Sequence, residues 1–474
     1  MQKYIQAFGK NDIRGIYGAD ITETLYFNIG RNYIDWLTTK TNKPAEQMVL
    51  TVCRDARLHS PQLTNALING VISKGAKIID LGLAPTPLGY YSEVSMDSII
   101  SAMIVTASHN PKEYNGLKMT FKNQTLNELQ IKELRDLTLN NWIEYTPNDC
   151  SVEKFDIIPA YISDMVSRFG NIGNGIKVVV DSANATGGIV GPELYRQLGC
   201  DVIELYSEPD GNFPNHHPNP SDLKTLKDLQ AKVIESNADI GIAFDGDSDR
   251  IGVVDNKGNA LTGDKLLLIY ALDLLNNGIK PTVVSEVKCS QVLYDTINKL
   301  GGNAIMTKTG HGYIKEKMKE TNATLAGEMS GHTFFKDRYF GFDDAIYAGC
   351  RIIEIISKNK QKNSHFTIQD MLVPFNSVFT SDEVRYPCPN ELKKSTIEKL
   401  KNIVSDEMFG TKIKDIVTLD GMRIIFDGGF ALIRQSNTEP VFTLRFEAKN
   451  AEECSKLKSA MINKLDEILA KESA

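Results

Sequence analysis

The chain has 474 residues, more than one hydrophobic core usually supports, and this length predicts roughly three or four domains. Its composition, 42% hydrophobic and 24% charged, is ordinary for a soluble globular protein. The formal net charge of −7 argues against general nucleic-acid binding, because that activity needs a broad basic surface.

Two features indicate the compartment. The first residues, Met1 to Gln6, lack the apolar core of a secretion signal, and no apolar run is long enough to span a bilayer. The seven cysteines are scattered and form no Cys-x-x-Cys pair, which argues against a disulfide framework and a zinc site. We therefore expect a cytoplasmic protein without membrane or nucleic-acid partners.

Three strand–helix–strand units follow one another along the chain. In each, a glycine (Gly75, Gly199 or Gly302) separates the helical pattern from the second apolar strand. The predicted units are strands 48–52 and 76–80 around helix 61–74, strands 177–181 and 201–205 around helix 191–198, and strands 281–285 and 303–306 around helix 290–299. Continuous apolar strands that alternate with helices indicate mainly parallel, buried sheets. We expect three related α/β domains.

The last hundred residues have a different pattern. A strand over 417–426, a turn at Asp427-Gly428-Gly429 and a strand over 430–433 predict a hairpin, and 441–446 predicts a further strand. Asn450 and Glu453 resemble a capping box before a terminal helix. We expect an α+β domain here, and domain boundaries that give residues 1–152, 153–257, 258–375 and 376–474.

Ser108 lies in the run Thr106-Ala107-Ser108-His109-Asn110-Pro111, directly after an apolar strand over 99–105. Ligands of open α/β sheets bind at the carboxyl ends of the strands, so this loop is placed to meet a ligand. The alternative is an ordinary polar turn before a proline, and the run alone does not decide between them.

A second run, Asp245-Gly246-Asp247-Ser248-Asp249-Arg250, places carboxylates at alternate positions after an apolar strand. An EF-hand is excluded, because its sixth and twelfth positions are Arg250 and Asn256 instead of Gly and Glu. Carboxylates this close favour a divalent cation such as Mg²⁺ over a solvated acidic turn. A metal beside a serine suggests phosphoryl transfer through a phosphoserine.

Two later runs suggest a sugar phosphate as ligand. Glycines in Gly327-Glu328-Met329-Ser330-Gly331-His332 flank an acceptor, a hydroxyl and an imidazole, which suit sugar hydroxyls. The run from Arg434 to Pro440 offers a guanidinium, two hydroxyls and an amide, which suit a phosphate. Additional cationic or titratable residues near predicted strand ends or glycines are Arg14, Lys118, Lys288 and His311.

These four runs, in this order, resemble the α-D-phosphohexomutase superfamily, and within it the bacterial phosphomannomutase/phosphoglucomutase group. The resemblance extends over nearly the whole chain and includes Asp12-Ile13-Arg14-Gly15 and Asp210-Gly211-Asn212-Phe213-Pro214. It implies four domains around a central cleft, three with an α/β core and a smaller α+β domain at the C-terminus.

The resemblance also implies an isomerase that interconverts hexose 1-phosphate and hexose 6-phosphate, with mannose ranked first and glucose also accepted. Ser108 would carry the phosphoryl group. Asp245, Asp247 and Asp249 would hold one Mg²⁺ per chain together with a seryl phosphate oxygen. Transfer to the free hydroxyl would give a hexose 1,6-bisphosphate, which would also serve as activator.

The remaining roles follow from the same resemblance. Lys118 and His332 are the candidates for the group that deprotonates the hydroxyl, with Arg14 as an electrostatic helper. Arg250 would brace the metal loop or a phosphate. The expected sugar ligands are Glu328 and Ser330, with Lys288 and His311 contributing, and the expected clamp on the non-reacting phosphate is Arg434, Ser436, Asn437 and Thr438.

Three alternatives stand beside this reading of the chain. A phosphoglucosamine mutase would keep the mechanism, but such enzymes more often differ at Met329 or Asn437. A metal-dependent sugar phosphatase would not need a second phosphate clamp. A non-catalytic sugar-phosphate binding protein would not need Ser108 or three aspartates. The quaternary state is expected to be a monomer or a homodimer.

Overall fold

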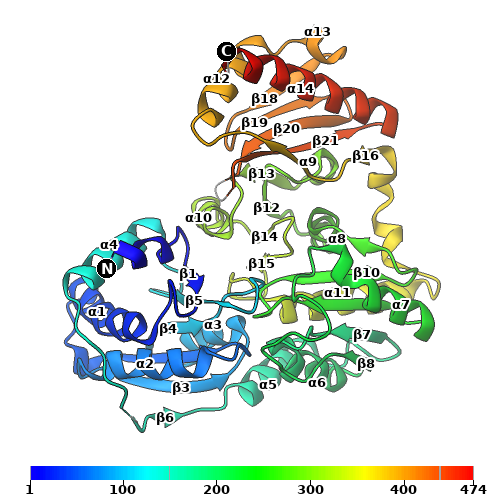
Figure 1. The fold of residues 1–474 in the computed structure, drawn as a ribbon. Helices are drawn as coiled ribbons and strands as arrows, with labels where there is room; N and C mark the ends of the chain where they lie inside the picture. The colour runs from blue at the N-terminus through cyan, green and yellow to red at the C-terminus, as the bar shows by residue number, and fades with distance from the viewer. Residues whose placement is uncertain (1, 149, 437–438, 473–474) are drawn as a thin grey trace. The chain divides into compact units, whose positions relative to one another are not determined.

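The computed structural model describes residues 2–148, 150–436 and 439–472. The chain packs as two compact units (Figure 1). Unit 1 comprises Met1–Leu261 and Ser330–Thr367, and unit 2 comprises Thr262–Met329 and Ile368–Ala474. The chain therefore leaves unit 1, returns to it for about forty residues, and leaves it again.

Unit 1 begins with a six-stranded mixed sheet, in which β2 pairs in parallel with β3 and β4 while β5 runs antiparallel to β1 and β4. The strand order is β1 (Ile13–Ile16), β5 (Tyr114–Met119), β4 (Ile99–Val105), β2 (Val49–Arg54), β3 (Lys77–Leu83) and β6 (Glu153–Lys154). The helices of this part are α1 (Glu23–Thr41), α2 (Ser60–Ile72), α3 (Thr86–Ser95) and α4 (Glu128–Asn140).

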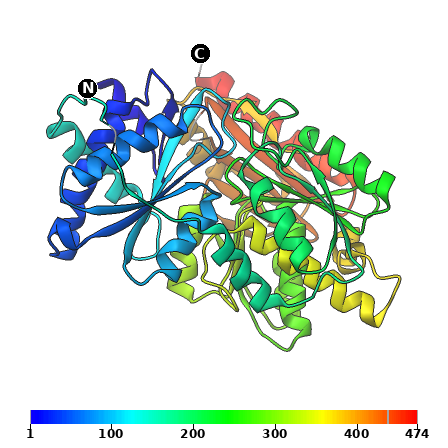
Figure 2. The ribbon, with the colours of Figure 1, turned by 90° about the horizontal axis from the view of Figure 1, so that it is seen from below.

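Helices cover both faces of this sheet (Figure 2), and the alternation of side chains along the strands explains the division. Leu50 and Val52 of β2 belong to the apolar core that contains α1, α2 and α4. Cys53 of the same strand faces the other way and meets α3 at Gly89, where a Cβ would lie 3.2 Å from the Cys53 Sγ and 2.6 Å from a carbon of Ile104. Glycine at this position lets α3 approach the sheet closely.

The second sheet of unit 1 has the order β11 (Ala260–Leu261), β10 (Ile251–Asp255), β9 (Ile240–Phe244), β7 (Lys177–Asp181) and β8 (Asp201–Leu205). Its helices are α5 (Ile158–Phe169), α6 (Gly191–Gln197) and α7 (Lys227–Ser236). The returning segment adds β15 (Thr333–Phe335) and α11 (Ala345–Lys362), and α11 packs against β9 and β10. Asp344 caps this helix, because its side chain accepts a hydrogen bond from the Tyr347 N–H.

In unit 2, β12 (Thr282–Glu286) pairs in parallel with β13 (Asn303–Thr307) and β14 (Leu325–Gly327). The accompanying helices are α8 (Gly263–Asn276), α9 (Gln291–Lys299) and α10 (His311–Thr321). The final sheet is antiparallel and carries α14 along one face (Figure 1). Its strands are β16 (Phe379–Thr380), β21 (Val441–Ala448), β20 (Gly429–Gln435), β19 (Met422–Phe426) and β18 (Ile413–Val417), with β17 (Val384–Pro387) also paired to β21, and its helices are α12 (Lys393–Ile403), α13 (Asp406–Phe409) and α14 (Ala451–Glu472).

The predicted α/β class, with mixed sheets that are largely parallel and a final α+β part, is confirmed. One local prediction was wrong. The single strand expected over 417–426 is two strands, β18 and β19, separated by a turn in which Gly421 has φ +79°. In the third strand–helix–strand unit Gly302 lies between the helix α9 and the strand β13, as predicted, and the neighbouring Gly301 has the left-handed conformation, with φ +87°. The four domain boundaries expected from the sequence stay a prediction.

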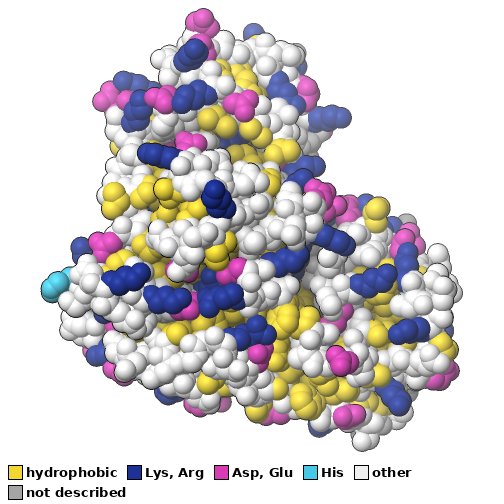
Figure 3. All heavy atoms as spheres, turned by 180° about the vertical axis from the view of Figure 1, so that it is seen from behind, with side chains coloured by type: hydrophobic (Ala, Val, Ile, Leu, Met, Phe, Trp, Pro, Cys, Tyr) yellow, Lys and Arg dark blue, Asp and Glu magenta, His cyan; other side chains and the backbone are white. Residues whose placement is uncertain are grey.

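The surface and the helices bear on the expected partners. Within residues 2–148, 150–436 and 439–472, no helix is both long and apolar enough to cross a membrane. On the face shown in Figure 3, basic and acidic side chains are interspersed. Such mixing of charges is common on globular proteins.

Candidate active site

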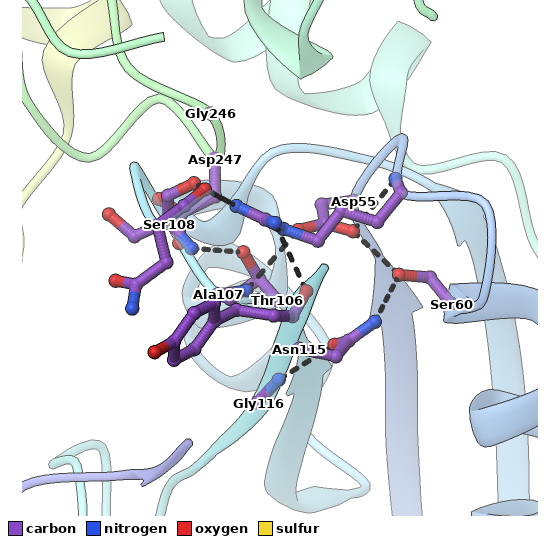
Figure 4. Close-up of polar contacts among 12 residues, drawn as sticks. Asp55, Ser60, Thr106, Ala107, Ser108, Asn115, Gly116, Gly246 and Asp247 are labelled. Carbon is purple, nitrogen blue, oxygen red and sulfur yellow. Dashed lines mark hydrogen bonds and ion pairs between the residues drawn. The ribbon is translucent and has the colours of Figure 1, made fainter. Parts of the chain in front are cut away.

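Ser108 lies on the loop that follows β4 and is 2% exposed. Its backbone has φ +50°, a left-handed conformation that is uncommon for a residue other than glycine. The Thr106 side-chain oxygen accepts a hydrogen bond from the Ser108 N–H over 2.9 Å and so stabilises this tight bend. Figure 4 shows Ser108 beside Gly246 and Asp247.

Arg57 supports the Ser108 loop from within the protein. Its fully buried guanidinium donates to the carbonyl oxygens of Ser108 at 2.9 Å, Asn110 at 2.7 Å, Pro111 at 2.6 Å and Tyr114 at 3.0 Å. Its Nε also donates to Asp55, which anchors the other end. One side chain therefore fixes four main-chain positions. Arg57 was not predicted, although it lies shortly after the strand expected over 48–52.

The acidic loop follows β9 and meets the Ser108 loop closely. A Cβ at Gly246 would lie 2.2 Å from the Ser108 carbonyl oxygen, so only glycine permits this approach. The approach allows the Ser108 Oγ to donate to the Asp245 Oδ2 over 2.7 Å. On the far side of the loop, the Thr86 Oγ1 donates to the Asp247 Oδ2 at 2.5 Å.

The three aspartates and Lys118 form one buried electrostatic cluster. The Lys118 Nζ lies 2.6 Å from the Asp247 Oδ2 and 2.5 Å from the Asp249 Oδ2. Burial favours the neutral amine, but the two carboxylates outweigh this effect and hold the pKa of Lys118 well above its ordinary value. Lys118 is therefore protonated and neutralises negative charge.

Asp245 behaves differently from its neighbours. Burial, together with repulsion from Asp249 and Asp247, raises the pKa of Asp245 to about 8. Burial opposes ionisation of Asp249 as well, yet Lys118 and His332 hold its pKa well below the ordinary range. Lys118 thus offsets part of the negative charge, and a further cation beside Asp245 would favour the ionised form of its carboxyl group.

The acidic loop fits a divalent cation. Asp245, Asp247 and Asp249 are buried, and each offers a carboxylate oxygen within 4.8 Å of the others. The Asp247 Oδ1 is buried and has no hydrogen-bond partner among the described residues. An unpaired buried carboxylate oxygen is costly unless something binds it, and carboxylate oxygens are the ligands that Mg²⁺ prefers. The donor set therefore suits the predicted magnesium ion.

His332 and Arg250 lie next to the same cluster. The His332 Nε2 lies 3.3 Å from the Asp249 Oδ1, and the Arg250 Nε lies 3.3 Å from the His332 Nε2. A short β-bridge between Arg250 and His332 holds the two backbones together. A second acidic residue, Asp343, lies 3.8 Å from the His332 Nε2 and was not predicted. Its signal, Asp343-Asp344 before a helix, resembles an ordinary N-cap.

Arg14 and His109 complete the cluster in unit 1. The Arg14 Nη1 donates to the Asn110 Oδ1 at 2.8 Å, and Arg14 also pairs with Asp12. The His109 Nδ1 lies 3.2 Å from the Ser108 Oγ. Burial and the nearby Arg250 lower the pKa of His109, so its imidazole is neutral. Unit 1 thus brings together seven predicted residues: Arg14, Ser108, Lys118, Asp245, Asp247, Asp249 and His332, with Arg250 beside them.

Unit 2 contains most of the residues predicted to read the sugar. The Glu328 Oε1 accepts the Gly310 N–H at 3.0 Å, immediately before His311 at the start of α10. The Lys288 Nζ lies 3.6 Å from the Glu286 Oε1, which also accepts the Met329 N–H at 2.9 Å. Ser330 belongs to unit 1, where its Oγ lies 3.1 Å from the His332 Nδ1.

The predicted phosphate loop follows β20 in unit 2. The Arg434 Nε donates to the Asp420 Oδ2 at 3.1 Å. Buried Lys393 donates to the carbonyl oxygens of Ser436 at 2.9 Å and Glu439 at 2.5 Å, so it spans the loop from one end to the other. The predicted ligands Asn437 and Thr438 lie outside the described residues.

Four family models match successive parts of the chain. The phosphoglucomutase/phosphomannomutase α/β/α domain I matches residues 5–141, domain II matches 159–258, domain III matches 262–372, and the C-terminal domain matches 383–464. The chain belongs to the phosphoglucomutase/phosphomannomutase family. The membership predicted from the four motifs is confirmed.

Individual relatives match over almost their whole length. A Pseudomonas aeruginosa protein named phosphomannomutase/phosphoglucomutase is 41% identical over 458 residues, which cover 97% of this chain and 95% of that one. A Neisseria gonorrhoeae phosphoglucomutase is 38% identical over 444 residues, covering 93% and 92%. A phosphoglucomutase/phosphomannomutase family protein from Burkholderia thailandensis has a solved structure with TM-score 0.85 at 33% identity, covering 97% and 96%. The protein is a phosphohexomutase, and hence an isomerase, as predicted.

Proposed function

We propose that this enzyme interconverts mannose 1-phosphate and mannose 6-phosphate, and the corresponding glucose phosphates, through a phosphoserine at Ser108. The observation that carries the proposal is the 2.7 Å hydrogen bond from the Ser108 Oγ to Asp245, in the buried acidic cluster. The names of the relatives support the choice of sugars.

Asp245, Asp247 and Asp249 would hold one Mg²⁺, together with an oxygen of the seryl phosphate. When bound, the ion offsets negative charge on the transferring phosphoryl group. Lys118 offsets part of the negative charge of Asp247 and Asp249, and Arg14 adds positive charge near the Ser108 loop through its contact with Asn110. These cations lower the cost of bringing an anionic substrate to an acidic loop.

In the first transfer, the free hydroxyl of the hexose monophosphate attacks the seryl phosphorus. The new oxygen–phosphorus bond forms as the bond to the Ser108 Oγ breaks, which gives a hexose 1,6-bisphosphate. The hydroxyl proton passes to His332, and the departing Ser108 Oγ takes up a proton from solvent to become a hydroxyl. His332 then releases its proton to solvent, so the number of protons is unchanged. Only the neutral form of His332 can accept the proton, because it has a lone pair, whereas protonated Lys118 has none.

In the second transfer, the Ser108 Oγ attacks the other phosphorus of the bisphosphate, and the bond from that phosphorus to the sugar oxygen breaks. The sugar oxygen takes up a proton in place of the one that Ser108 loses, which gives the product hydroxyl.

The substrate must be held while either end reacts. We assign the sugar hydroxyls to Glu328 and Ser330, with Lys288 and His311 contributing, and the non-reacting phosphate to Arg434, Ser436, Asn437 and Thr438. Arg250, 15% exposed and 3.3 Å from His332, would brace the acidic loop or contact a phosphate. Planar guanidinium groups bind phosphate through two hydrogen bonds and so fix its orientation.

The proposal is tested by ³¹P NMR with Mg²⁺ and a trace of glucose 1,6-bisphosphate, with mannose, glucose and glucosamine 1-phosphates offered in parallel. We expect the first two to become 6-phosphates and Ser108→Ala to abolish conversion. Turnover of glucosamine 1-phosphate alone would identify a phosphoglucosamine mutase. Release of inorganic phosphate as the main product would identify a phosphatase.

Several properties belong to the same proposal. We expect one Mg²⁺ per chain, activation by hexose 1,6-bisphosphate, a cytoplasmic location, and a monomer or homodimer without nucleic-acid or membrane partners. The metal content of the purified enzyme tests the expectation of one Mg²⁺ per chain. Its mass in solution tests the expectation of a monomer or homodimer.

A further inference from the structure

The turn between β18 and β19 packs directly against the strand that carries Arg434. At Gly421, with φ +79°, a Cβ would lie 2.2 Å from the Ile433 carbonyl oxygen and 2.7 Å from the Arg434 Cα. A side chain other than hydrogen would overlap the backbone of β20, so glycine is needed for this contact. The preceding residue of the turn is Asp420, and the contact places it beside the Arg434 side chain.

The Asp420 carboxylate joins two parts of unit 2 through one oxygen. Its Oδ2 accepts from the Arg434 Nε at 3.1 Å and from the Thr309 N–H at 3.3 Å. The side chains of Arg434 and Asp420 are 11% and 21% exposed, so solvent screens their charges only partly. Thr309 lies in the loop between β13 and α10, far from Arg434 in sequence.

The next amide of that loop has a different carboxylate partner. The Gly310 N–H donates to the Glu328 Oε1 at 3.0 Å. Two adjacent amides thus connect two carboxylates: Glu328, which we assign to the sugar, and Asp420, which holds the arginine that we assign to the phosphate. Hydrogen bonds on either side of the Thr309–Gly310 backbone therefore link Arg434 to Glu328 within unit 2.

We propose that Asp420 is a positioning residue, which orients Arg434 for the non-reacting phosphate and links that phosphate site to the sugar-reading loop. A guanidinium has five N–H donors, and the contact with Asp420 uses the one on Nε, while a bidentate phosphate contact uses two. Because Asp420 holds the Nε edge of the Arg434 guanidinium, it fixes the plane in which the guanidinium can bind a phosphate. The proposal rests on the function proposed above.

The matched pair of variants is Asp420→Asn and Asp427→Asn. The Asp420→Asn side chain would keep the size and an acceptor oxygen but lose the charge. Asp427, in the next turn of the same sheet, is 70% exposed and pairs with Lys414 and Lys449, so it controls for removal of an acidic turn residue. We expect Asp420→Asn to raise KM for glucose 1-phosphate about tenfold with kcat changed less than about threefold, and Asp427→Asn to leave both unchanged.

A double-mutant cycle with Arg434→Gln separates positioning from general damage. If Asp420 acts through Arg434, Asp420→Asn raises KM by less than about twofold once Arg434 is already replaced. Additive effects would overturn the proposal. A lower KM in Asp420→Asn would also overturn it, because Asp420 would then compete with phosphate for the arginine.

Calorimetry keeps this inference separate from the proposed function. Glucose 1-phosphate is titrated into Ser108→Ala protein with and without Asp420→Asn, and we expect about tenfold weaker binding in the double variant. If the double variant binds more weakly but the wild-type enzyme shows no turnover, the proposed function is wrong and the role of Asp420 is supported. If the wild-type enzyme turns over normally but both proteins bind equally well, the proposed function is supported and the role of Asp420 is wrong. Thermal unfolding of each variant checks that the fold is intact.

Discussion

Lys118 contacts Asp247 and Asp249 at once, with its Nζ 2.6 and 2.5 Å from their carboxylate oxygens. Lys118 comes from β5, whereas the aspartates come from the loop after β9, so the contact joins the two sheets of unit 1. All three side chains are at least 95% buried. The lysine ammonium thus supplies positive charge to the same carboxylates that suit a divalent cation.

Lys118→Met should lower the stability of the folded protein and make it depend more strongly on Mg²⁺. Removing one partner of a buried ion pair costs about 3–5 kcal/mol, because the other charge stays buried and unpaired. We expect a lower melting temperature in EDTA, and a larger rise on adding Mg²⁺ than in the wild type. Lys132→Met removes an exposed pair with Glu128 and should change stability by less than about 0.5 kcal/mol. Equal Mg²⁺ effects on Lys118→Met and the wild type would show that the ion and the lysine do not share carboxylates.

Arg57→Lys should lower the catalytic rate, although we assign Arg57 no contact with the substrate. Lysine has three donors in place of the five that the Arg57 side chain uses here, so at least two buried acceptors lose their partner, at about 1–3 kcal/mol each. We expect lower stability and a kcat at least tenfold lower, because the Ser108 loop loses its fixed geometry. Arg135→Lys, at an exposed pair with Asp136, is the control. An unchanged kcat would mean that Arg57 only stabilises the fold.

Asp344 should make stability depend on pH. Burial raises the pKa of Asp344 to about 6, although hydrogen bonds from Tyr339, the Tyr347 N–H and Tyr161 oppose the shift. The folded protein therefore binds this proton more tightly than the unfolded chain. The resulting stability is present below about pH 4 and is lost as the pH rises through about 6, by roughly 3 kcal/mol.

Asp344→Asn provides the comparison, because asparagine can still cap α11 but does not ionise. We expect the unfolding free energy of the wild type, relative to the variant, to fall between pH 4 and pH 6 and then stay constant up to pH 8. A difference that does not change with pH would contradict the assignment of a raised pKa to Asp344.

Lys393→Met should weaken binding of the non-reacting phosphate, because Lys393 supports the loop after β20 to which we assign that phosphate. The buried ammonium holds the carbonyl oxygens of Ser436 and Glu439, so its loss frees both ends of the loop. We expect KM for glucose 1-phosphate to rise about fivefold or more while kcat changes little. Lys394→Met, at the exposed neighbouring position, should leave KM unchanged. A change in kcat alone would place the effect outside substrate binding.

The sequence predicted regular elements well wherever an apolar run was bounded by glycine or polar residues. The bounds of β4, β7 and β8 are those expected. The prediction failed at 417–426, because Leu419 extends the apolar pattern across a turn and the stronger signal at Asp427-Gly428-Gly429 follows soon after. Asp420-Gly421 is itself a turn signal, and it marks the residue that contacts Arg434.

The candidate site shows a similar limit. Residues to which we assign the chemistry, such as Ser108 and Asp245, lie in short polar runs after strands and can be found by pattern. Arg57 donates to main-chain carbonyl oxygens, which every residue has. The residue types of its partners therefore give no sign that an arginine binds them. Lys393 was missed for a related reason, because it too binds main-chain carbonyl oxygens, more than forty positions away in the chain. Asp343 was missed because Asp343-Asp344 before a helix looks like an ordinary N-cap.

The hydrogen bond between Ser108 and Asp245 spans 137 residues of chain, and this separation sets an order of events during synthesis. At about 5–20 residues per second, the ribosome delivers Asp245 roughly 7–27 s after Ser108. Throughout that interval the nascent polypeptide has its serine loop but no acidic loop beside it. Unit 1 must also wait for residues 330–367, which bring His332. The proposed phosphoryl-transfer site of unit 1 can therefore be complete only after about three quarters of the chain has been translated.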